Sequence, residues 1–275
     1  MCGIVGVVGN SNAVDILIQG LEKLEYRGYD SAGIYVTDAP DKGCLVKSVG
    51  RIADLRAKIS SDVKGSTGIG HTRWATHGQA TEDNAHPHTS ETGRFVLVHN
   101  GVIENYLQIK EEYLQGHKFK GQKDTEIAVH LIGKFVDEDG LSVLEALKKS
   151  LHIIQGSYAF ALVDSQAPDT IYVAKNKSPL LIGVGEGYNM VCSDAMAMIR
   201  ETSQFMEIHD KELVVLTKDA ITVTDYEGNA IERGTYTAEL DLSDIGKGTY
   251  PYYMLKEIDE QPTVMRKLIS TYADD

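Results

Sequence analysis

The stretch MCGIVGVVG, residues Met1 to Gly9, decides the fold. A cysteine directly follows the initiator methionine, and an apolar run typical of a buried strand comes next. If Met1 is removed, Cys2 carries both a thiol and a free α-amino group. An α-amino group, with a pKa of ~7.7–8.0 in peptides, suits a thiol of pKa ~8.5 as its base. The alternative is an incidental cysteine, because cysteine usually behaves as a small hydrophobic residue.

The composition is that of a globular protein with a sizeable core. Hydrophobic residues make up 42% of the 275 residues and charged residues 24%, which favours one large domain with an appendage. The formal net charge of −13 opposes binding to nucleic acid or anionic lipid, so neither is an expected partner. The sequence has neither a membrane-length apolar run nor a signal peptide, and we expect a cytoplasmic protein. The three cysteines, Cys2, Cys44 and Cys192, suggest free thiols.

Apolar periodicity predicts strands and helices in alternation through the first half of the chain. The expected strands there are 2–9, 33–37, 45–49, 68–78 running into a loop, and 94–101 ending in a turn. The expected helices are one through Val14, Leu17, Leu21 and Leu24, then 52–59, 104–114, 124–136 and 141–151.

The second half changes to short apolar strands, which implies two sheets. These strands are expected at 158–164, 170–175, 180–183, 190–192, 212–216 and 221–224. An α+β sandwich of layers is favoured over a doubly wound fold, whose βαβ alternation would continue throughout. Residues 226–250 resemble an irregular linker, and 252–272 a helix interrupted by Pro262. The predicted organisation is thus a domain over 1–225, followed by a linker and helix over 226–275.

The tripeptide HNG, residues His99 to Gly101, closes one predicted strand. Asn-Gly is a common turn dipeptide, so a structural turn is one interpretation. At a strand end, however, the Asn100 amide and the Gly101 N–H can both point at one place, as in an oxyanion hole. Asn100 and Gly101 are therefore catalytic candidates beside Cys2.

The loop HTRWATHG concentrates side chains suited to recognition, namely Arg73, Trp74, Thr76 and His77. The structural alternative is a surface ion pair for Arg73 and a core position for Trp74. Asp124, at the start of a predicted helix, is a further candidate, although an N-cap role would also explain it.

Two other motifs carry weaker signals. His86 and His88 in HPH have a metal-like spacing, but Pro87 and the lack of further paired ligands favour a loop. GVGEG, residues 183–187, falls short of a dinucleotide-binding fingerprint and favours a hairpin turn. We expect no metal and no organic cofactor.

Seven motifs in order resemble the glutamine-hydrolysing part of the glutamine–fructose-6-phosphate amidotransferase family. They are MCGIVGVVG, LEYRGYDSAGI, GHTRWATHG, NAHPH, VHNGVIENY, DTEIAVHLI and YMLKEIDEQP, and they run from Cys2 to about Pro262. The resemblance implies a four-layer αββα fold of the N-terminal nucleophile hydrolase and class II glutamine amidotransferase type. It makes 1–225 the glutaminase domain and 226–275 the connection toward a sugar-phosphate isomerase domain.

The resemblance also implies the roles of the candidate residues. Cys2, exposed by removal of Met1, attacks the side-chain amide of L-glutamine and forms a γ-glutamyl thioester. Asn100 and Gly101 bind the oxyanion, whereas Arg73 holds the α-carboxylate and Asp124 the α-ammonium group. Trp74, Thr76 and His77 belong to a loop that closes over the substrate.

The expected activity is hydrolysis of L-glutamine to glutamate and ammonia, and the full enzymes use this ammonia to convert fructose 6-phosphate to glucosamine 6-phosphate. Because the chain ends at Asp275, we expect no isomerase domain in it and no aminosugar formation. A homodimer is an expectation for the full enzyme only. Two alternatives stay open: a catalytically silent module that senses glutamine or mediates assembly, and an amidase of the same fold with another substrate.

Overall fold

The computed structural model describes residues 2–75, 78–238, 250 and 253–273. The chain divides into two compact units, Met1–Glu239 and Leu240–Asp275. The first unit contains two sheets and the second contains helix α7, Tyr253–Ala273. Strand β14, Tyr236–Thr237, lies near the end of the first unit and pairs with β11, so part of a segment expected to be irregular linker adds a strand to a sheet.

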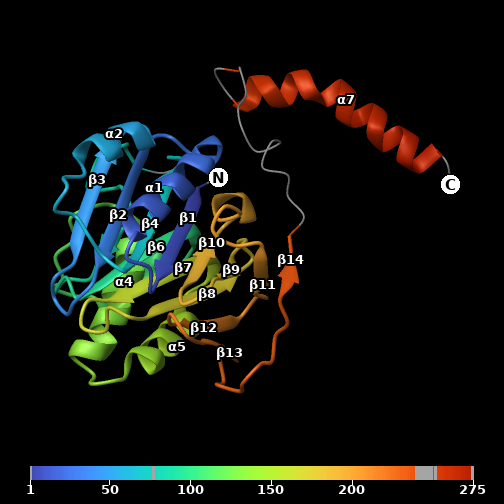
Figure 1. Cartoon of the computed structure of the whole chain (residues 1–275). Helices are drawn as coiled ribbons and strands as arrows, with labels where there is room; N and C mark the ends of the chain where they lie inside the picture. Colours follow the sequence, from blue (N-terminus) through green and yellow to red (C-terminus); the bar gives the residue numbers. More distant parts are fainter. Residues whose placement is uncertain (1, 76–77, 239–249, 251–252, 274–275) are drawn as a thin grey trace. The chain divides into compact units, whose positions relative to one another are not determined.

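Both sheets of the first unit are antiparallel, and they match the two sheets expected from the sequence (Figure 1). The eight-stranded sheet has the order β14-β11-β9-β10-β1-β4-β2-β3, and the six-stranded sheet has the order β13-β12-β8-β7-β6-β5. The strands are β1 Gly3–Val8, β2 Ser31–Thr37, β3 Cys44–Val49, β4 Thr67–Arg73, β5 His88–Thr89, β6 Phe95–Ile103, β7 Gly156–Asp164, β8 Ile171–Asn176, β9 Leu181–Val184, β10 Asn189–Cys192, β11 Gln204–Glu207, β12 Glu212–Leu216 and β13 Ile221–Asp225.

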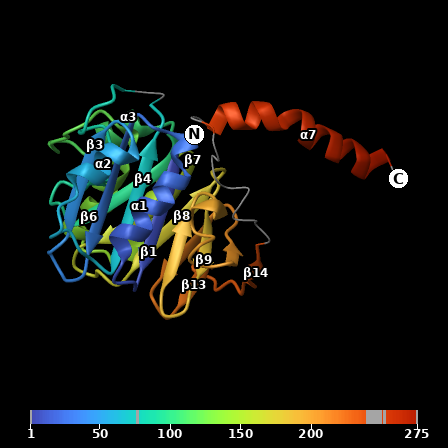
Figure 2. The same ribbon diagram turned by 45° about the horizontal axis from the view of Figure 1, so that its top comes forward.

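Helices cover the outer face of each sheet, and α1 lies against β1 and β4 (Figure 2). The helices are α1 Ala13–Lys23, α2 Ile52–Lys58, α3 Tyr106–Tyr113, α4 Asp124–Asp137 and α5 Val143–Ile153, with short 3-10 turns η1 Glu25–Arg27 and η2 Ala195–Ala197. A capping box sets the start of α5, because the Ser142 hydroxyl accepts from Glu145 N and the Glu145 carboxylate accepts from Ser142 N.

Side chains on the two faces of each central strand pack into different cores. In β1, Val5 and Val7 pack in the core shared with α1, whereas Ile4 and Val8 lie in the core between the sheets. In β6, Phe95 and Leu97 pack against α4, and Val96 and Val98 face the other sheet. The three cores separate four layers in the order helix, sheet, sheet, helix. The predicted αββα sandwich is therefore confirmed.

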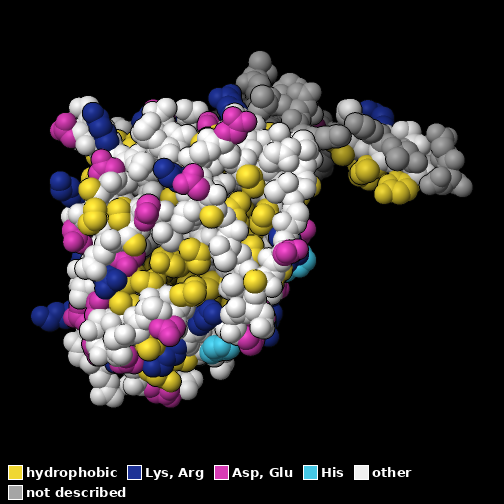
Figure 3. Space-filling model, turned by 60° about the horizontal axis from the view of Figure 1, so that its bottom comes forward, with side chains coloured by type: hydrophobic (Ala, Val, Ile, Leu, Met, Phe, Trp, Pro, Cys, Tyr) yellow, Lys and Arg dark blue, Asp and Glu magenta, His cyan; other side chains and the backbone are white. Residues whose placement is uncertain are grey.

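Two sequence expectations were wrong in detail. Asn100 and Gly101 do not end their strand in a turn, because β6 continues to Ile103 and stays paired with β7. Helix α7 runs through Pro262 without interruption, although proline removes one helical hydrogen bond. Hydrophobic side chains, among them Leu255, Ile258 and Leu268, are exposed along α7 (Figure 3). Among the described residues, no helix combines the length and the apolar character needed to cross a bilayer.

Candidate active site

Cys2 stands immediately before the central strand β1. Antiparallel pairing with β4 places Gly3 opposite Thr72, so the residue before Gly3 meets the end of β4. There the backbone N–H of Trp74 lies 3.3 Å from the Cys2 sulfur, and the thiol lies 3.8 Å from the Trp74 carbonyl oxygen. The half-buried thiol therefore sits directly beside the peptide bond that joins Arg73 to Trp74.

Asn100 approaches Cys2 from the opposite sheet. Alternate residues of a strand share a face, so Asn100 lies on the same side of β6 as Val98, toward β1. The Nδ2 atom of Asn100 donates to the Cys2 carbonyl oxygen at 3.1 Å. Two residues 98 positions apart in the sequence thus meet at one end of the sandwich.

His71 determines which way the Asn100 amide points. Its Nε2 atom lies 3.1 Å from the His99 carbonyl oxygen and 2.9 Å from Asn100 Oδ1. Because a carbonyl oxygen only accepts, Nε2 must carry the proton. Burial lowers the pKa of His71 to about 3, which keeps the ring neutral at pH 7. His71 lies in the GHTRWATHG motif, but the sequence analysis did not predict a role for it.

Arg27, which sequence reasoning also missed, fixes the backbone of Cys2. Its Nε atom donates to the Cys2 carbonyl oxygen at 3.2 Å, and its Nη1 atom lies 3.3 Å from Asp194 Oδ2. The same carboxylate oxygen accepts from Tyr26 Oη at 2.8 Å. The only signal in the sequence was the position of Arg27 in the YRGYDSAG motif.

Arg73 is 2% exposed, so the surface ion pair considered from the sequence was wrong. Its guanidinium donates to the carbonyl oxygens of Gly78 and Gln79 at 3.2 and 3.1 Å. Burial lowers the pKa of Arg73, and Cys2, Asp30 and Asp124 act in the opposite direction. The cation is thus held near the acidic groups of the site.

Asp124 is the first residue of α4, and the N-cap is Lys123, so the capping interpretation of Asp124 was wrong. Its Oδ2 atom accepts from Ile103 N at 2.9 Å, and its Oδ1 atom accepts from Thr125 N at 3.0 Å. The side chain is 11% exposed, and Lys123 Nζ lies 3.7 Å away. These contacts connect the start of α4 to the end of β6 next to Asn100.

Trp74 is 40% exposed, so the core position considered from the sequence was also wrong. Its ring meets Tyr29 edge-on, with centroids 5.6 Å apart. Thr76 and His77, the other two candidates of this loop, lie outside the described residues.

Gly101 adopts a backbone conformation that requires glycine. Its φ is +135°, and a Cβ atom added there would lie 2.1 Å from the Ser157 carbonyl oxygen. The backbone can therefore adopt this conformation directly after Asn100 only because Gly101 has no side chain.

His86 lies in a bend, as the loop expectation had it, and His88 begins the two-residue strand β5. Both are buried and form a histidine cluster with His71 and His99. The His86 ring stacks on His71 at 4.0 Å and meets His88 edge-on at 4.7 Å, and His86 Nδ1 accepts from His99 N at 3.3 Å. Burial lowers the pKa of all four rings. The cluster forms a neutral support behind Asn100.

Comparison with known proteins agrees with this arrangement. Residues 71–201 match the family model described as a glutamine amidotransferase domain. The solved structure of glutamine phosphoribosylpyrophosphate amidotransferase from B. subtilis, complexed with ADP and GMP, is similar with a TM-score of 0.71 and 29% identity. That match covers 83% of this chain and 50% of the other. The chain is therefore a glutamine amidotransferase domain of class II, with the N-terminal nucleophile hydrolase fold.

Curated relatives make the assignment more specific. The chain is 83% identical over 275 residues to glutamine–fructose-6-phosphate aminotransferase (isomerizing) of Streptococcus mutans serotype c, and 84% identical to the enzyme of that name from Streptococcus pyogenes serotype M1. Each match covers 100% of this chain and 45% of the relative, so the chain spans about half the length of these relatives. Its sequence is thus similar throughout to a glutamine amidotransferase domain of these enzymes.

Proposed function

We propose that this domain hydrolyses L-glutamine to glutamate and ammonia with Cys2 as the nucleophile. One observation carries the proposal. The Cys2 sulfur lies 3.3 Å from Trp74 N, while its carbonyl oxygen accepts from Asn100 Nδ2 at 3.1 Å, so a nucleophile and an oxyanion donor share one place. In the full-length protein, the ammonia would aminate fructose 6-phosphate to glucosamine 6-phosphate.

The reaction begins once removal of Met1 exposes the α-amino group of Cys2. This amine takes the thiol proton, and the sulfur forms a bond to the side-chain carbonyl carbon of glutamine. The oxygen of the tetrahedral intermediate becomes negative and accepts from the second N–H of the Asn100 amide and from the Gly101 N–H. The amine returns its proton to the leaving nitrogen, ammonia departs, and a γ-glutamyl thioester remains. Water then cleaves the thioester to glutamate and the free thiol.

Two opposite charges would select a free amino acid as the substrate. The planar guanidinium of Arg73 suits bidentate binding of the α-carboxylate, and the Asp124 carboxylate suits the α-ammonium group. A glutamine side chain inside a protein offers neither terminal charge. Trp74, together with Thr76 and His77, would cover the bound substrate and exclude water.

The partners of this domain follow from the same proposal. L-Glutamine is the substrate, and a sugar-phosphate isomerase domain of the full-length protein would receive the ammonia. We place the protein in the cytoplasm and expect the full-length enzyme to form a homodimer.

An electrophilic glutamine analogue tests the nucleophile directly. After treatment with 6-diazo-5-oxo-L-norleucine, intact mass spectrometry should show one adduct per chain, and peptide mapping should place it on Cys2 of a chain that begins with Cys2. The Cys2→Ala variant is the matched control and should neither react nor release ammonia from glutamine. A wild-type protein that binds glutamine but leaves Cys2 unlabelled would instead be a silent sensing or assembly module.

A further inference from the structure

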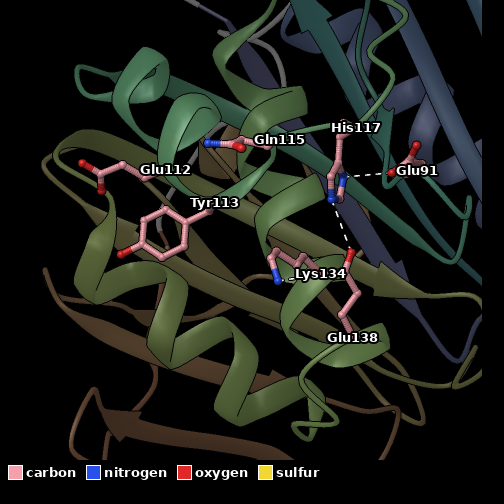
Figure 4. A pocket seen from close by; sticks show the side chains of 8 residues that line it. Glu91, Glu112, Tyr113, Gln115, His117, Lys134 and Glu138 are labelled. Carbon is pink, nitrogen blue, oxygen red and sulfur yellow. Dashed lines mark hydrogen bonds and ion pairs between the residues drawn. The ribbon is translucent and has the colours of Figure 1, made fainter.

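A second cluster of polar side chains brings together three residues that take no part in the proposed glutamine site. Glu91 lies between β5 and β6, His117 lies between α3 and α4, and His130 lies within α4. Figure 4 shows Glu91 and His117 pointing toward each other at a surface pocket of about 490 Å³. His130 is 2% exposed, whereas Glu91 is exposed, so the cluster reaches from the core to the surface.

The donor atoms of this cluster converge closely. His117 Nδ1 lies 2.9 Å from Glu91 Oε2 and 3.4 Å from His130 Nδ1. One ligand atom from each of the three residues lies within 4.8 Å of the others. Around a tetrahedral zinc ion, with bonds of ~2.0–2.2 Å, neighbouring ligand atoms are ~3.3 Å apart. Small side-chain adjustments would bring the three atoms to that spacing.

We propose that Glu91, His117 and His130 bind a zinc ion, with water from the open pocket as the fourth ligand. Two imidazoles and one carboxylate are a ligand set that zinc prefers, and the remaining position suits a water. Sequence patterns did not predict this site, because its ligands lie at positions 91, 117 and 130 and form no short motif.

The surroundings of His117 favour this role. Its second ring nitrogen, Nε2, lies 3.4 Å from Glu138 Oε1 (Figure 4). A histidine that binds a metal through one nitrogen commonly donates from the other to a carboxylate, which orients the ring and raises its basicity. Glu138 is itself held by Lys134, whose Nζ atom lies 3.0 Å from Oε2, so the positive charge of Lys134 is paired within the pocket.

Zinc would fasten the β5–β6 loop and the α3–α4 connection to α4. Without metal, the same side chains form a hydrogen-bonded group in which the His117 Nδ1 proton lies between Glu91 and His130. Zinc would bind Nδ1 of the neutral ring in its other tautomer, with the ring proton on Nε2 facing Glu138, and three coordinate bonds would replace the two hydrogen-bonded contacts. The expected consequence is stabilisation of the fold that is independent of glutamine chemistry.

The test uses the 275-residue chain with Cys2→Ala, which removes the thiol most able to bind zinc elsewhere. Calorimetric titration with Zn²⁺ should show one site per chain, and Co²⁺ in its place should give the visible absorption of a tetrahedral ion. His117→Gln should abolish both signals, and Glu138→Gln should weaken zinc binding by about 10- to 100-fold. Glu112→Gln, which alters the same pocket outside the ligand set, should change neither signal.

Thermal unfolding of a variant that is expected to keep the fold completes the test. Glu91 is exposed, so Glu91→Gln should retain the fold while losing the rise in melting temperature that zinc produces in the parent chain. Zinc binding that is absent in the parent, or equally strong in His117→Gln and Glu91→Gln, would overturn the proposal and leave only the hydrogen-bonded group.

Discussion

His71 Nε2 lies 2.9 Å from Asn100 Oδ1, and the Nδ2 atom of the same amide lies 3.1 Å from the Cys2 carbonyl oxygen. If the amide turned over, Nδ2 would face the protonated Nε2 of His71, and Oδ1 would face the Cys2 oxygen. Both hydrogen bonds would be replaced by repulsive contacts, so one orientation prevails. His71 therefore acts as a positioning residue for the proposed oxyanion donor.

Replacement of His71 by phenylalanine should lower kcat for glutamine hydrolysis while KM changes little. Phenylalanine keeps a ring beside His86 but cannot donate to Asn100 Oδ1, so the amide loses its fixed orientation. His71→Gln, whose side chain retains an N–H donor, should restore part of kcat. Ammonia release measured over a range of glutamine concentrations separates the two constants. An unchanged kcat in His71→Phe would contradict the positioning role.

Asn100→Ala should reduce kcat by about 10²- to 10³-fold, because loss of one oxyanion donor typically costs ~2.7–4 kcal/mol of transition-state stabilisation. Asn100→Asp, similar in shape but without a donor at pH 7, should show a comparable loss. Electrophilic labelling of Cys2 should persist in both variants if the thiol itself remains reactive. A loss below threefold in ammonia release would remove Asn100 from the mechanism.

Arg73→Lys should lower kcat/KM for glutamine by about 10- to 100-fold, mainly through KM. Lysine keeps the charge but loses the planar pair of donors that binds a carboxylate. Glutaminamide, which lacks the α-carboxylate, provides the matched control substrate. The variant should discriminate less between the two substrates than the wild type does. Equal losses for both substrates would indicate a structural defect instead.

Gly101→Ala should destabilise the fold more than Gly140→Ala. Gly140 has a φ of +70° and no atom within 4 Å of an added Cβ, so alanine there costs about 1 kcal/mol of conformational energy. At Gly101 an added Cβ would also lie 2.1 Å from Ser157 O, so the backbone must shift. Urea unfolding of both variants measures the difference. Equal free energies of unfolding would show that β6 adapts freely at this position.

Acidification should destabilise the protein below about pH 6.5 through the buried histidine cluster. Burial lowers the pKa of His71 to about 3 and lowers those of His86, His88 and His99. The unfolded chain binds protons near pH 6.5 and the folded chain does not, so stability is full above this pH and declines toward pH 3. Each ring contributes at most about 1.4 kcal/mol per pH unit.

Urea unfolding at about pH 7.5 and about pH 5.5 checks this dependence before most carboxylates titrate. His209→Gln, which removes an exposed histidine, should leave the difference between the two pH values unchanged. A free energy of unfolding that is equal at both pH values would contradict the prediction.

The local sequence determined most of the strands and helices, and it identified the candidate site residues. Short apolar runs predicted β1 and β6, and helical spacing predicted α1, because the burial of a strand or of one helix face shows in the nearby sequence. The strand parity that turns Cys2 and Asn100 toward the inner core is also contained in the sequence. The strands β5, β11 and β14 escaped prediction, and β5 and β14, with two residues each, are too short to carry a pattern.

Tertiary structure decided which of these residues meet. Register between β1 and β4 put Cys2 beside Arg73, and the facing of two sheets brought Asn100 to Cys2. The same packing buried Arg73 and the four histidines, and it assembled Glu91, His117 and His130 from three segments. Periodicity determines which way a side chain points relative to its own strand or helix. Only the packing of distant segments determines what lies opposite it, because contacts between residues far apart in the chain have no local pattern.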